Sequence, residues 1–362
     1  MTAAAVRLDD RHCPLPPRRA PAAAATMPAL APRAELSPCP DGELDRLPAQ
    51  RGALDLVLAL RHAGPTRLQV RWEAQGDPTA PALVVLGGIS ATRHLAANAV
   101  DGEPGWWQDQ VGRGRALDPT RHRLIAIDWL GADGALDVPI ATADQADAVA
   151  AVLDALGIAR LAGFVGCSYG AMVGLAFAAR HRSRLARLIA ISGGHRPHPF
   201  ASAWRGLQRK IVALGQRQQA EVEALSLARQ LAMLSYRTPE ELAARFDAPV
   251  ELVDQRARAA SDGYLEACGA RYTARWSATA FLRLSESIDL HVVDPAEVTT
   301  PTTLVAIADD RLVPVADLRA LAASLAGPCR LHELASAYGH DAFLKEVDAI
   351  ATVLVAAIGG GS

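Results

Sequence analysis

A five-residue pattern, Gly166-Cys-Ser-Tyr-Gly170, constrains this chain more than any other feature of its sequence. An apolar, strand-like run leads into the pattern, and a long Ala-rich run of helical character follows it. A Gly-x-Ser-x-Gly segment between a strand and a helix forms a sharp turn that exposes the serine oxygen. The glycines let the backbone fold tightly, and the helix directs its free N–H groups toward the serine. We therefore predict that Ser168 is a nucleophile; the alternative is a small-residue turn at the head of a helix.

Strand and helix patterns alternate on both sides of this turn. Apolar, β-rich runs lie at 54–60, 67–73, 82–86, 123–128, 161–165, 185–192, 302–308 and 330–334. Helical patterns lie at 143–156, 169–181, 315–325 and 341–358, and Thr142 with Gln145 form a capping box before the first of them. Such alternation predicts the α/β class, with a mostly parallel central sheet and helices on both faces.

The alternation is interrupted between residues 194 and 291, where the pattern is mostly helical and lacks β-rich runs. We predict one α/β core formed by residues 51–193 and 292–362, with residues 194–291 inserted as a helical lid. Residues 1–50 are rich in Ala, Pro and Arg, a composition that favours a disordered extension.

Composition excludes several functional classes. The formal net charge is −2 and both signs are well mixed, which argues against a nucleic-acid-binding surface. No uncharged apolar run approaches the roughly 18 residues of a membrane span, and the N-terminus lacks the apolar core of a signal peptide. We therefore expect a cytoplasmic protein that does not enter a membrane.

The cysteines and histidines argue against a metal site. Five widely spaced cysteines without a C-x-x-C pair favour neither a disulfide framework nor structural zinc. His195 and His198 lack neighbouring carboxylates, so they are poor metal ligands. Cys167 is interpreted as a small buried hydrophobe, with a reactive thiol as the alternative. We expect no metal and no cofactor.

A serine nucleophile needs a base and an acid that orients the base. Where such a turn carries the serine, the acid and then the histidine follow it in the chain. Asp310 closes the apolar run 304–308 and is our candidate acid, with its neighbour Asp309 as the rival. His340 lies in a Gly-flanked loop after the last strand pattern and is the candidate base.

Two N–H groups are required to stabilise the oxyanion. One is the amide of Tyr169, directly after the nucleophile. The other is expected from Gly87-Gly88-Ile89, which follows the strand pattern 82–86. Ile89 and Gly88 are both candidate donors, and a simple Gly-Gly turn is the alternative.

Several further motifs resemble the homoserine O-acyltransferase family of the α/β-hydrolase superfamily. They are Gly87-Gly88-Ile89-Ser90 with His94, Pro104-Gly-Trp-Trp107, Gly112-x-Gly-x-Ala-Leu-Asp118, Ser226-Leu-Ala-Arg229 and the segment after it, and Tyr338-Gly-His-Asp-Ala-Phe-Leu344. The resemblance extends from about Leu54 to the C-terminus.

This resemblance implies an α/β-hydrolase fold and acyl transfer from acetyl-CoA or succinyl-CoA to L-homoserine, in methionine biosynthesis. It implies that Ser168, Asp310 and His340 are catalytic, that Arg229 is a substrate-binding cation, and that Asp341 holds the substrate ammonium. It also implies a homodimer formed through the lid helices.

Departures from the family pattern leave the substrates open. Tyr169 and Ala171 differ from the usual residues of the turn, and the usual Asp-Pro after Gln208-Arg209 is missing. Arg93 or Arg229 could bind a succinyl carboxylate, which favours succinyl over acetyl. Serine could replace homoserine, since one methylene is worth only about 1–3 kcal/mol of discrimination. An ester or thioester hydrolase and a non-enzymatic binding protein are the alternatives from other classes.

Overall fold

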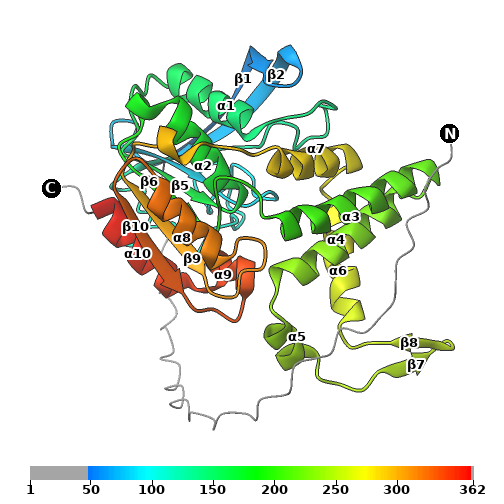
Figure 1. Cartoon of the computed structure of the whole chain (residues 1–362). Coiled ribbons are helices and arrows are strands. Elements are labelled where there is room, and N and C mark those ends of the chain that lie inside the picture. Colours follow the sequence, from blue (N-terminus) through cyan, green and yellow to red (C-terminus); the bar gives the residue numbers. More distant parts are fainter. Residues whose placement is uncertain (1–47, 360–362) are drawn as a thin grey trace, which may run out of the picture. The chain divides into compact units, whose positions relative to one another are not determined.

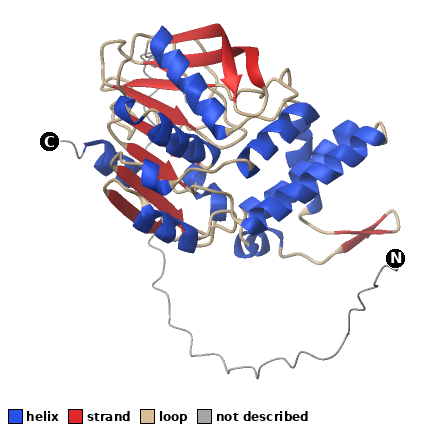
Figure 2. Ribbon diagram, turned by 45° about the horizontal axis from the view of Figure 1, so that its top comes forward, coloured by secondary structure: helices blue, strands red, loops and turns tan. Residues whose placement is uncertain are grey.

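The computed structural model describes residues 48–359 (Figure 1). Its centre is an eight-stranded sheet in the order β1-β2-β4-β3-β5-β6-β9-β10. The strands are β1 (Ala49–Leu60), β2 (Gly64–Gln75), β3 (Ala82–Leu86), β4 (Arg123–Ile127), β5 (Gly163–Cys167), β6 (Leu188–Ile191), β9 (Thr302–Ile307) and β10 (Cys329–Leu334). β2 pairs antiparallel with both β1 and β4, and the other neighbours are parallel. The predicted fold class is confirmed, with helices on both faces of a mostly parallel sheet (Figure 2).

The predicted N-terminal extension, residues 1–50, lies almost entirely outside the described residues. Only its last residues are described, and Ala49 and Gln50 already belong to β1.

Apolar sequence explains the central strands. β3, β4, β5 and β6 are buried along their whole length, because helices cover both faces of a parallel sheet. Each fully buried Val, Leu, Ile or Phe side chain contributes about 1.5–3 kcal/mol relative to exposure. The helices α1 (Thr142–Ala155), α2 (Tyr169–Arg180) and α8 (Val315–Ser324) connect successive parallel strands.

The start of α1 differs from the prediction. The residue before the helix is Ala141, whose amide donates to Asp144 Oδ2 at 2.7 Å. Gln145 instead bonds the amide and carbonyl of Leu130 at 2.9 and 3.2 Å. The predicted Thr142–Gln145 capping box is therefore wrong, because a tertiary contact takes the Gln145 side chain.

The predicted helical insertion contains five helices among the described residues. They are α3 (Pro199–Arg217), α4 (Glu221–Tyr236), α5 (Pro239–Phe246), α6 (Asp262–Thr273) and α7 (Ala278–Asp289). It also contains a small hairpin that the sequence did not predict, formed by β7 (Glu251–Val253) and β8 (Arg256–Arg258). Figure 1 shows α3, α4 and α6 side by side, at a distance from the sheet.

The single terminal helix predicted at 341–358 is divided in two. α9 (Ala342–Lys345) and α10 (Val347–Gly359) are separated at Glu346. Trp107 Nε1 donates to the Phe343 carbonyl at 3.0 Å, and Gln110 Nε2 donates to the Val347 carbonyl at 2.8 Å. Side chains from the loop after β3 thus bond carbonyls around the break.

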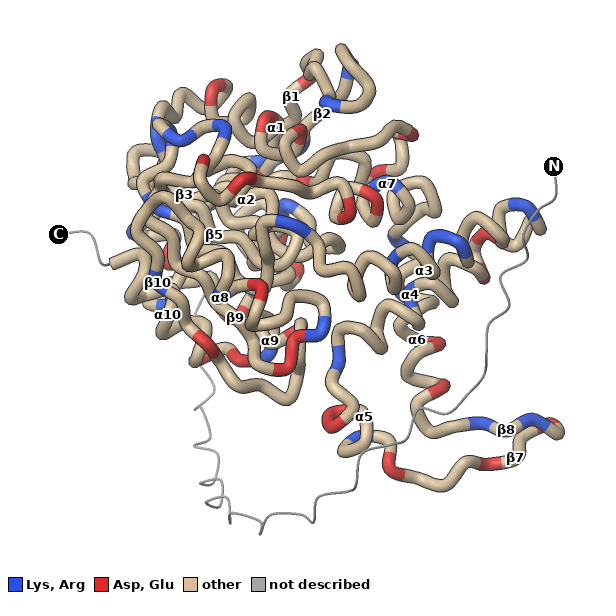
Figure 3. Tube along the Cα trace, in the orientation of Figure 1, with Lys and Arg blue, Asp and Glu red and all other residues tan. Residues whose placement is uncertain are grey.

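Charged residues of both signs are interspersed along the described chain (Figure 3). Within residues 48–359, no helix is long and apolar enough to cross a membrane.

Candidate active site

The turn between β5 and α2 places Ser168 in the wall of a cavity. Ser168 has φ 55° and ψ −113°, a conformation that costs a non-glycine residue about 1–3 kcal/mol. A Cβ on Gly166 would lie 2.2 Å from the Gly170 carbonyl oxygen, and one on Gly170 would lie 2.2 Å from the Leu86 carbonyl oxygen. Both glycines are thus required by the close approach of backbone to backbone.

Ser168, His340 and Asp310 form a hydrogen-bonded chain. Ser168 Oγ lies 2.7 Å from His340 Nε2, and His340 Nδ1 lies 2.6 Å from Asp310 Oδ2. Asp310 Oδ1 accepts from two backbone amides of its own loop at 2.9 and 3.0 Å. Asp310 is buried whereas Asp309 is exposed, so the structure places Asp310 and not Asp309 against the histidine.

The protonation of His340 is governed by opposing effects. Burial pulls the pKa of His340 down, but the charge and hydrogen bond of Asp310, helped by the charge of Asp341, outweigh burial and raise that pKa above its ordinary value. An Asp310 carboxylate accepts the Nδ1–H, so the neutral ring presents the Nε2 lone pair to the Ser168 hydroxyl. This is the arrangement of a nucleophile, its base and an orienting acid.

Two backbone amides beside Ser168 are available to bind an anion. Ile89 and Tyr169 both line the cavity, and within the described chain neither amide donates to another protein group. Trp129 Nε1 donates to the Gly88 carbonyl at 3.1 Å. The C=O and N–H of one trans peptide point in opposite directions, so this bond also sets the direction of the Ile89 N–H. Gly88 also lines the cavity, and its amide likewise donates to no group of the described chain, so both candidate donors remain. Sequence reasoning missed Trp129, which carries no motif.

The Tyr169 side chain ties the turn to the helical insertion. Its ring packs edge-on against Trp129, with centroids 4.7 Å apart, and its hydroxyl lies 2.6 Å from Ser287 Oγ on α7. Burial raises the pKa of the Tyr169 phenol, so the group stays a neutral hydroxyl. Tyr169, at a position that departs from the family pattern, therefore links the nucleophile to the insertion.

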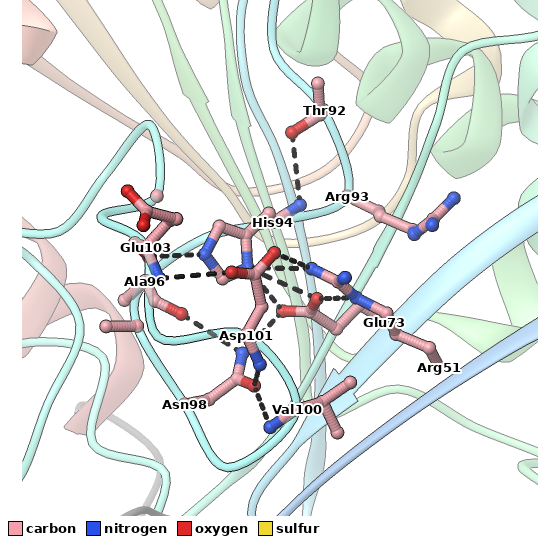
Figure 4. A network of polar contacts seen from close by, with 12 residues as sticks. Arg51, Glu73, Thr92, Arg93, His94, Ala96, Asn98, Val100, Asp101 and Glu103 are labelled. Carbon is pink, nitrogen blue, oxygen red and sulfur yellow. Dashed lines mark hydrogen bonds and ion pairs between the residues drawn. The ribbon is translucent and has the colours of Figure 1, made fainter.

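A buried polar network holds the loop after β3 (Figure 4). Its centre is Glu73 on β2, which accepts from Arg51 Nε at 2.6 Å and from Asn98 Nδ2 at 2.8 Å. His94 Nδ1 lies 3.1 Å from the same carboxylate, and Arg51 also binds Asp101 at 2.7 Å. The network anchors the loop that begins with Gly88 and Ile89.

Arg93 does not face the cavity. Its Nη1 lies 2.6 Å from Asp128 Oδ2, and its amide donates to Asp128 Oδ1 at 2.8 Å. Arg93 is not among the residues that line the cavity. The suggestion that Arg93 binds an acyl carboxylate is therefore wrong, because Asp128 occupies its guanidinium.

Arg229 and Asp341, the residues assigned to substrate, both line the cavity of about 270 Å³ that contains Ser168. The Arg229 guanidinium lies 4.9 Å from the ring centroid of Tyr272, and in the described part of the chain it has no ion pair. Asp341 Oδ2 lies 3.3 Å from Arg237 Nε. Burial raises the pKa of Asp341 although the charge of Arg237 opposes this. Nothing in the sequence pointed to Arg237.

Three further groups in or near the cavity bear on its chemistry. Arg205 of α3 lines the cavity, as does Ser192, whose buried hydroxyl has no partner among residues 48–359. The Cys167 thiol is fully buried, and burial raises its pKa well above the ordinary value, which favours the structural interpretation over a reactive thiol. The described residues include no group of three His, Cys, Asp or Glu placed to hold a metal ion.

Comparisons with known proteins agree with this geometry. Residues 81–347 match the family described as the alpha/beta hydrolase fold. A homoserine O-succinyltransferase of Xanthomonas campestris pv. campestris is 60% identical over 319 residues, covering 88% of this chain and 86% of that protein. A serine O-succinyltransferase of Litchfieldella anticariensis is 32% identical, covering 77% and 88% of the two chains. The crystal structure of a homoserine O-acetyltransferase from Bacillus anthracis superposes with a TM-score of 0.79 at 15% identity, covering 86% and 97%.

Proposed function

The chain belongs to the α/β-hydrolase fold family and, within it, to the homoserine O-acyltransferases, and from this premise we propose that it transfers an acyl group from an acyl-CoA to the hydroxyl of L-homoserine, in methionine biosynthesis. The observation that carries the proposal is the hydrogen-bonded chain Ser168–His340–Asp310, found in a protein 60% identical to a homoserine O-succinyltransferase.

The first half-reaction acylates Ser168. His340 Nε2, at 2.7 Å, takes the Ser168 proton as Oγ bonds to the thioester carbonyl carbon. The carbon–sulfur bond then breaks, and His340 returns the proton to the sulfur, so that free CoA leaves and an acyl ester remains on Ser168. Asp310 holds the imidazole in the required tautomer and stabilises the imidazolium formed in between.

The amides of Ile89 and Tyr169 serve as oxyanion donors in this scheme. A negative charge develops on the carbonyl oxygen in both half-reactions, and pre-oriented N–H groups stabilise it without reorganising. Trp129 holds the Gly88–Ile89 peptide in place through the Gly88 carbonyl.

The second half-reaction delivers the acyl group to the amino acid. His340 removes the proton of the homoserine hydroxyl, whose oxygen attacks the ester carbon; Ser168 then leaves and regains its proton. Arg229 suits the substrate carboxylate and Asp341 its ammonium, since both line the cavity with Ser168. The ammonium would replace Arg237 as the partner of Asp341.

Water is the competing acceptor. The cavity wall includes residues of the insertion, such as Arg205 and Tyr236, together with core residues such as Ser168. A cavity that the insertion partly lines and that binds the amino acid beside Ser168 raises the effective concentration of its hydroxyl relative to water. This is the physical difference between a transferase and a hydrolase built on the same three residues.

Succinyl-CoA is our preferred donor, because the relative with 60% identity is a homoserine O-succinyltransferase. Serine is the second candidate acceptor, favoured by the 32% identical serine O-succinyltransferase. Turnover with homoserine and with serine at equal concentration, measured by mass spectrometry of the products, distinguishes the two acceptors.

The release of free CoA from succinyl-CoA tests the proposed function. We expect release to depend on homoserine, and Ser168→Ala to abolish it. Release at one rate with and without an amino acid would identify a thioester hydrolase instead. Activity retained in Ser168→Ala would remove the assigned nucleophile.

We also propose a cytoplasmic homodimer that needs no cofactor beyond its acyl-CoA co-substrate. Exposed apolar side chains on α3 and α4 support association through the insertion: Leu207, Leu214, Val222 and Leu227 are 52–63% exposed. Sedimentation at micromolar concentration should give twice the mass of one chain, and a monomer would contradict the dimer.

A further inference from the structure

Arg205 lines the cavity that contains Ser168, and only some of the N–H groups of its guanidinium have protein partners. Its Nε and Nη2 both donate to Asp289 Oδ1, at 2.9 and 2.6 Å, and Nη2 also lies 3.3 Å from Ser202 Oγ. Its Nη1 has no protein partner within residues 48–359. The side chain is only 12% exposed. One edge of the group is thus held in place, and one nitrogen is left for a ligand.

The Asp289 carboxylate pairs with a second arginine as well as with Arg205. Arg209 Nη1 lies 2.7 Å from Asp289 Oδ2, so two guanidinium groups share one carboxylate. Arg209 also donates to Ser285 and does not line the cavity, whereas Arg205 does. A surplus positive charge in a mostly buried place is costly unless an anion pairs with it.

The lining of the whole cavity also has more positively than negatively charged side chains. Its lining contains the guanidinium groups of Arg196, Arg205 and Arg229 against the carboxylates of Asp317 and Asp341. Arg229 and Asp341 are matched by the carboxylate and ammonium of an amino acid. Arg205 then remains for a second ligand anion, while Arg196 is exposed.

We propose that Arg205 binds the distal carboxylate of a dicarboxylic acyl group on the CoA donor, and so selects succinyl over acetyl. The inference rests on the proposed acyl transfer. An acetyl group ends in a methyl group, whereas a succinyl group carries a carboxylate at the end of two methylenes. A guanidinium held by Asp289 is already oriented to receive it, and the complex neutralises the surplus charge.

The test compares donors of different charge in wild type and Arg205→Gln. With homoserine as acceptor, kcat/KM is measured for succinyl-CoA, acetyl-CoA and butyryl-CoA, the last matching the succinyl carbon count without its carboxylate. Arg205→Gln should lower the succinyl-CoA value on the order of 100-fold, as expected for loss of one member of a buried charge pair. The acetyl-CoA and butyryl-CoA values should change little.

Arg209→Gln is the matched control, because it removes the other guanidinium from Asp289 outside the cavity lining. It removes one of the two positive charges that share Asp289 but no group that contacts the acyl carboxylate, so it should lower the succinyl-to-acetyl ratio less than Arg205→Gln does. An equal fall for all donors in Arg205→Gln would overturn the proposal, as would a ratio that shifts in Arg196→Gln instead.

Donor binding separates this inference from the proposed function. Calorimetry on Ser168→Ala, with and without Arg205→Gln, measures the Kd of succinyl-CoA and butyryl-CoA without turnover. Arg205→Gln should weaken only succinyl-CoA, whichever acceptor the wild type uses. Unchanged succinyl-CoA binding would contradict the role of Arg205, whereas absence of homoserine-dependent turnover in wild type would contradict only the proposed function.

Discussion

Trp129 contacts both segments that carry the proposed oxyanion donors, and it shares the Gly88 carbonyl with the Ala91 amide, which donates to it at 2.9 Å. Trp129 bonds the Gly88 carbonyl at 3.1 Å, and the Ile89 N–H belongs to the same peptide group. Trp129 also packs against the ring of Tyr169, whose amide is the other donor. Trp129 thus contacts both segments although it contributes no atom to the proposed chemistry.

Trp129→Phe should lower kcat roughly 10-fold, less than the roughly 10²–10³ lost when a donor is removed outright. The ring still fills its site, but the Gly88 carbonyl keeps only the hydrogen bond that the Ala91 amide donates to it at 2.9 Å. KM for acyl-CoA should stay unchanged, since the peptide acts in the transition state. Trp204→Phe is the control, because it removes an indole–carbonyl bond of 3.2 Å within the insertion. An unchanged kcat in Trp129→Phe would contradict this role.

The pKa of His340 determines how activity depends on pH. His340 must be neutral to act as a base, and its pKa lies above the ordinary imidazole value because Asp310 and Asp341 outweigh burial. Activity should thus fall as the pH drops through a value above about 6.5.

Asp310→Asn should move this acid limb to lower pH, since burial then dominates, and should cut kcat on the order of 10⁴-fold. Profiles of kcat/KM against pH for both proteins provide the measurement. An acid limb at the same pH in both would show that Asp310 does not set the pKa of His340.

At the scale of elements, the contact between the turn after β5 and helix α7 links catalysis to the insertion. Tyr169 Oη lies 2.6 Å from Ser287 Oγ, and both groups are buried. Ser287→Ala should lower the free energy of unfolding by about 1 kcal/mol, since it removes one hydrogen bond of a buried phenol that keeps Gln145 as a second partner.

Tyr169→Phe in the Ser287→Ala background should cost less than Tyr169→Phe alone, because the Ser287 hydrogen bond is already absent there. Urea denaturation of the four proteins of the cycle measures the coupling free energy. Strictly additive effects would show that the bond does not stabilise the fold.

The central strands could be predicted because each is a short apolar run between turns, and helices bury both of its faces. The β7–β8 hairpin could not, because all six strand residues are exposed and show no alternation of burial. Its turn residues, Asp254 and Gln255, have φ values of 48° and 61° without a glycine. The break in the terminal helix at Glu346 could not be predicted either. The side chains that bond the carbonyls around it, Trp107 and Gln110, lie far away in the sequence.

At the scale of the whole molecule, the parallel sheet explains which site residues the sequence could indicate. Ser168 follows β5, Ile89 follows β3, Asp310 follows β9 and His340 follows β10, so all four lie at the carboxyl edge of the sheet. Chain order and loop position were enough to bring them together.

Residues that act through tertiary contacts could not be found in this way. Arg205 is defined by Asp289, which lies 84 positions further along the chain, and Arg237 is defined by Asp341. Arg93 was misjudged for the same reason, because Asp128 neutralises it from 35 positions away. The sequence shows that a charged residue lies in a loop, but it does not show which residue forms an ion pair with it.

For the whole molecule, the proposed function means that Ser168 holds an acyl group and that the cavity, lined in part by the insertion, keeps this group for an amino acid. Rapid quenching after mixing with succinyl-CoA, followed by mass spectrometry of the peptide that contains Ser168, measures this directly. We expect one succinyl group on Ser168, stable in buffer and removed quickly when homoserine is added. An unlabelled Ser168, or a label lost at the same rate with and without homoserine, would rule out the proposed acyl transfer through Ser168.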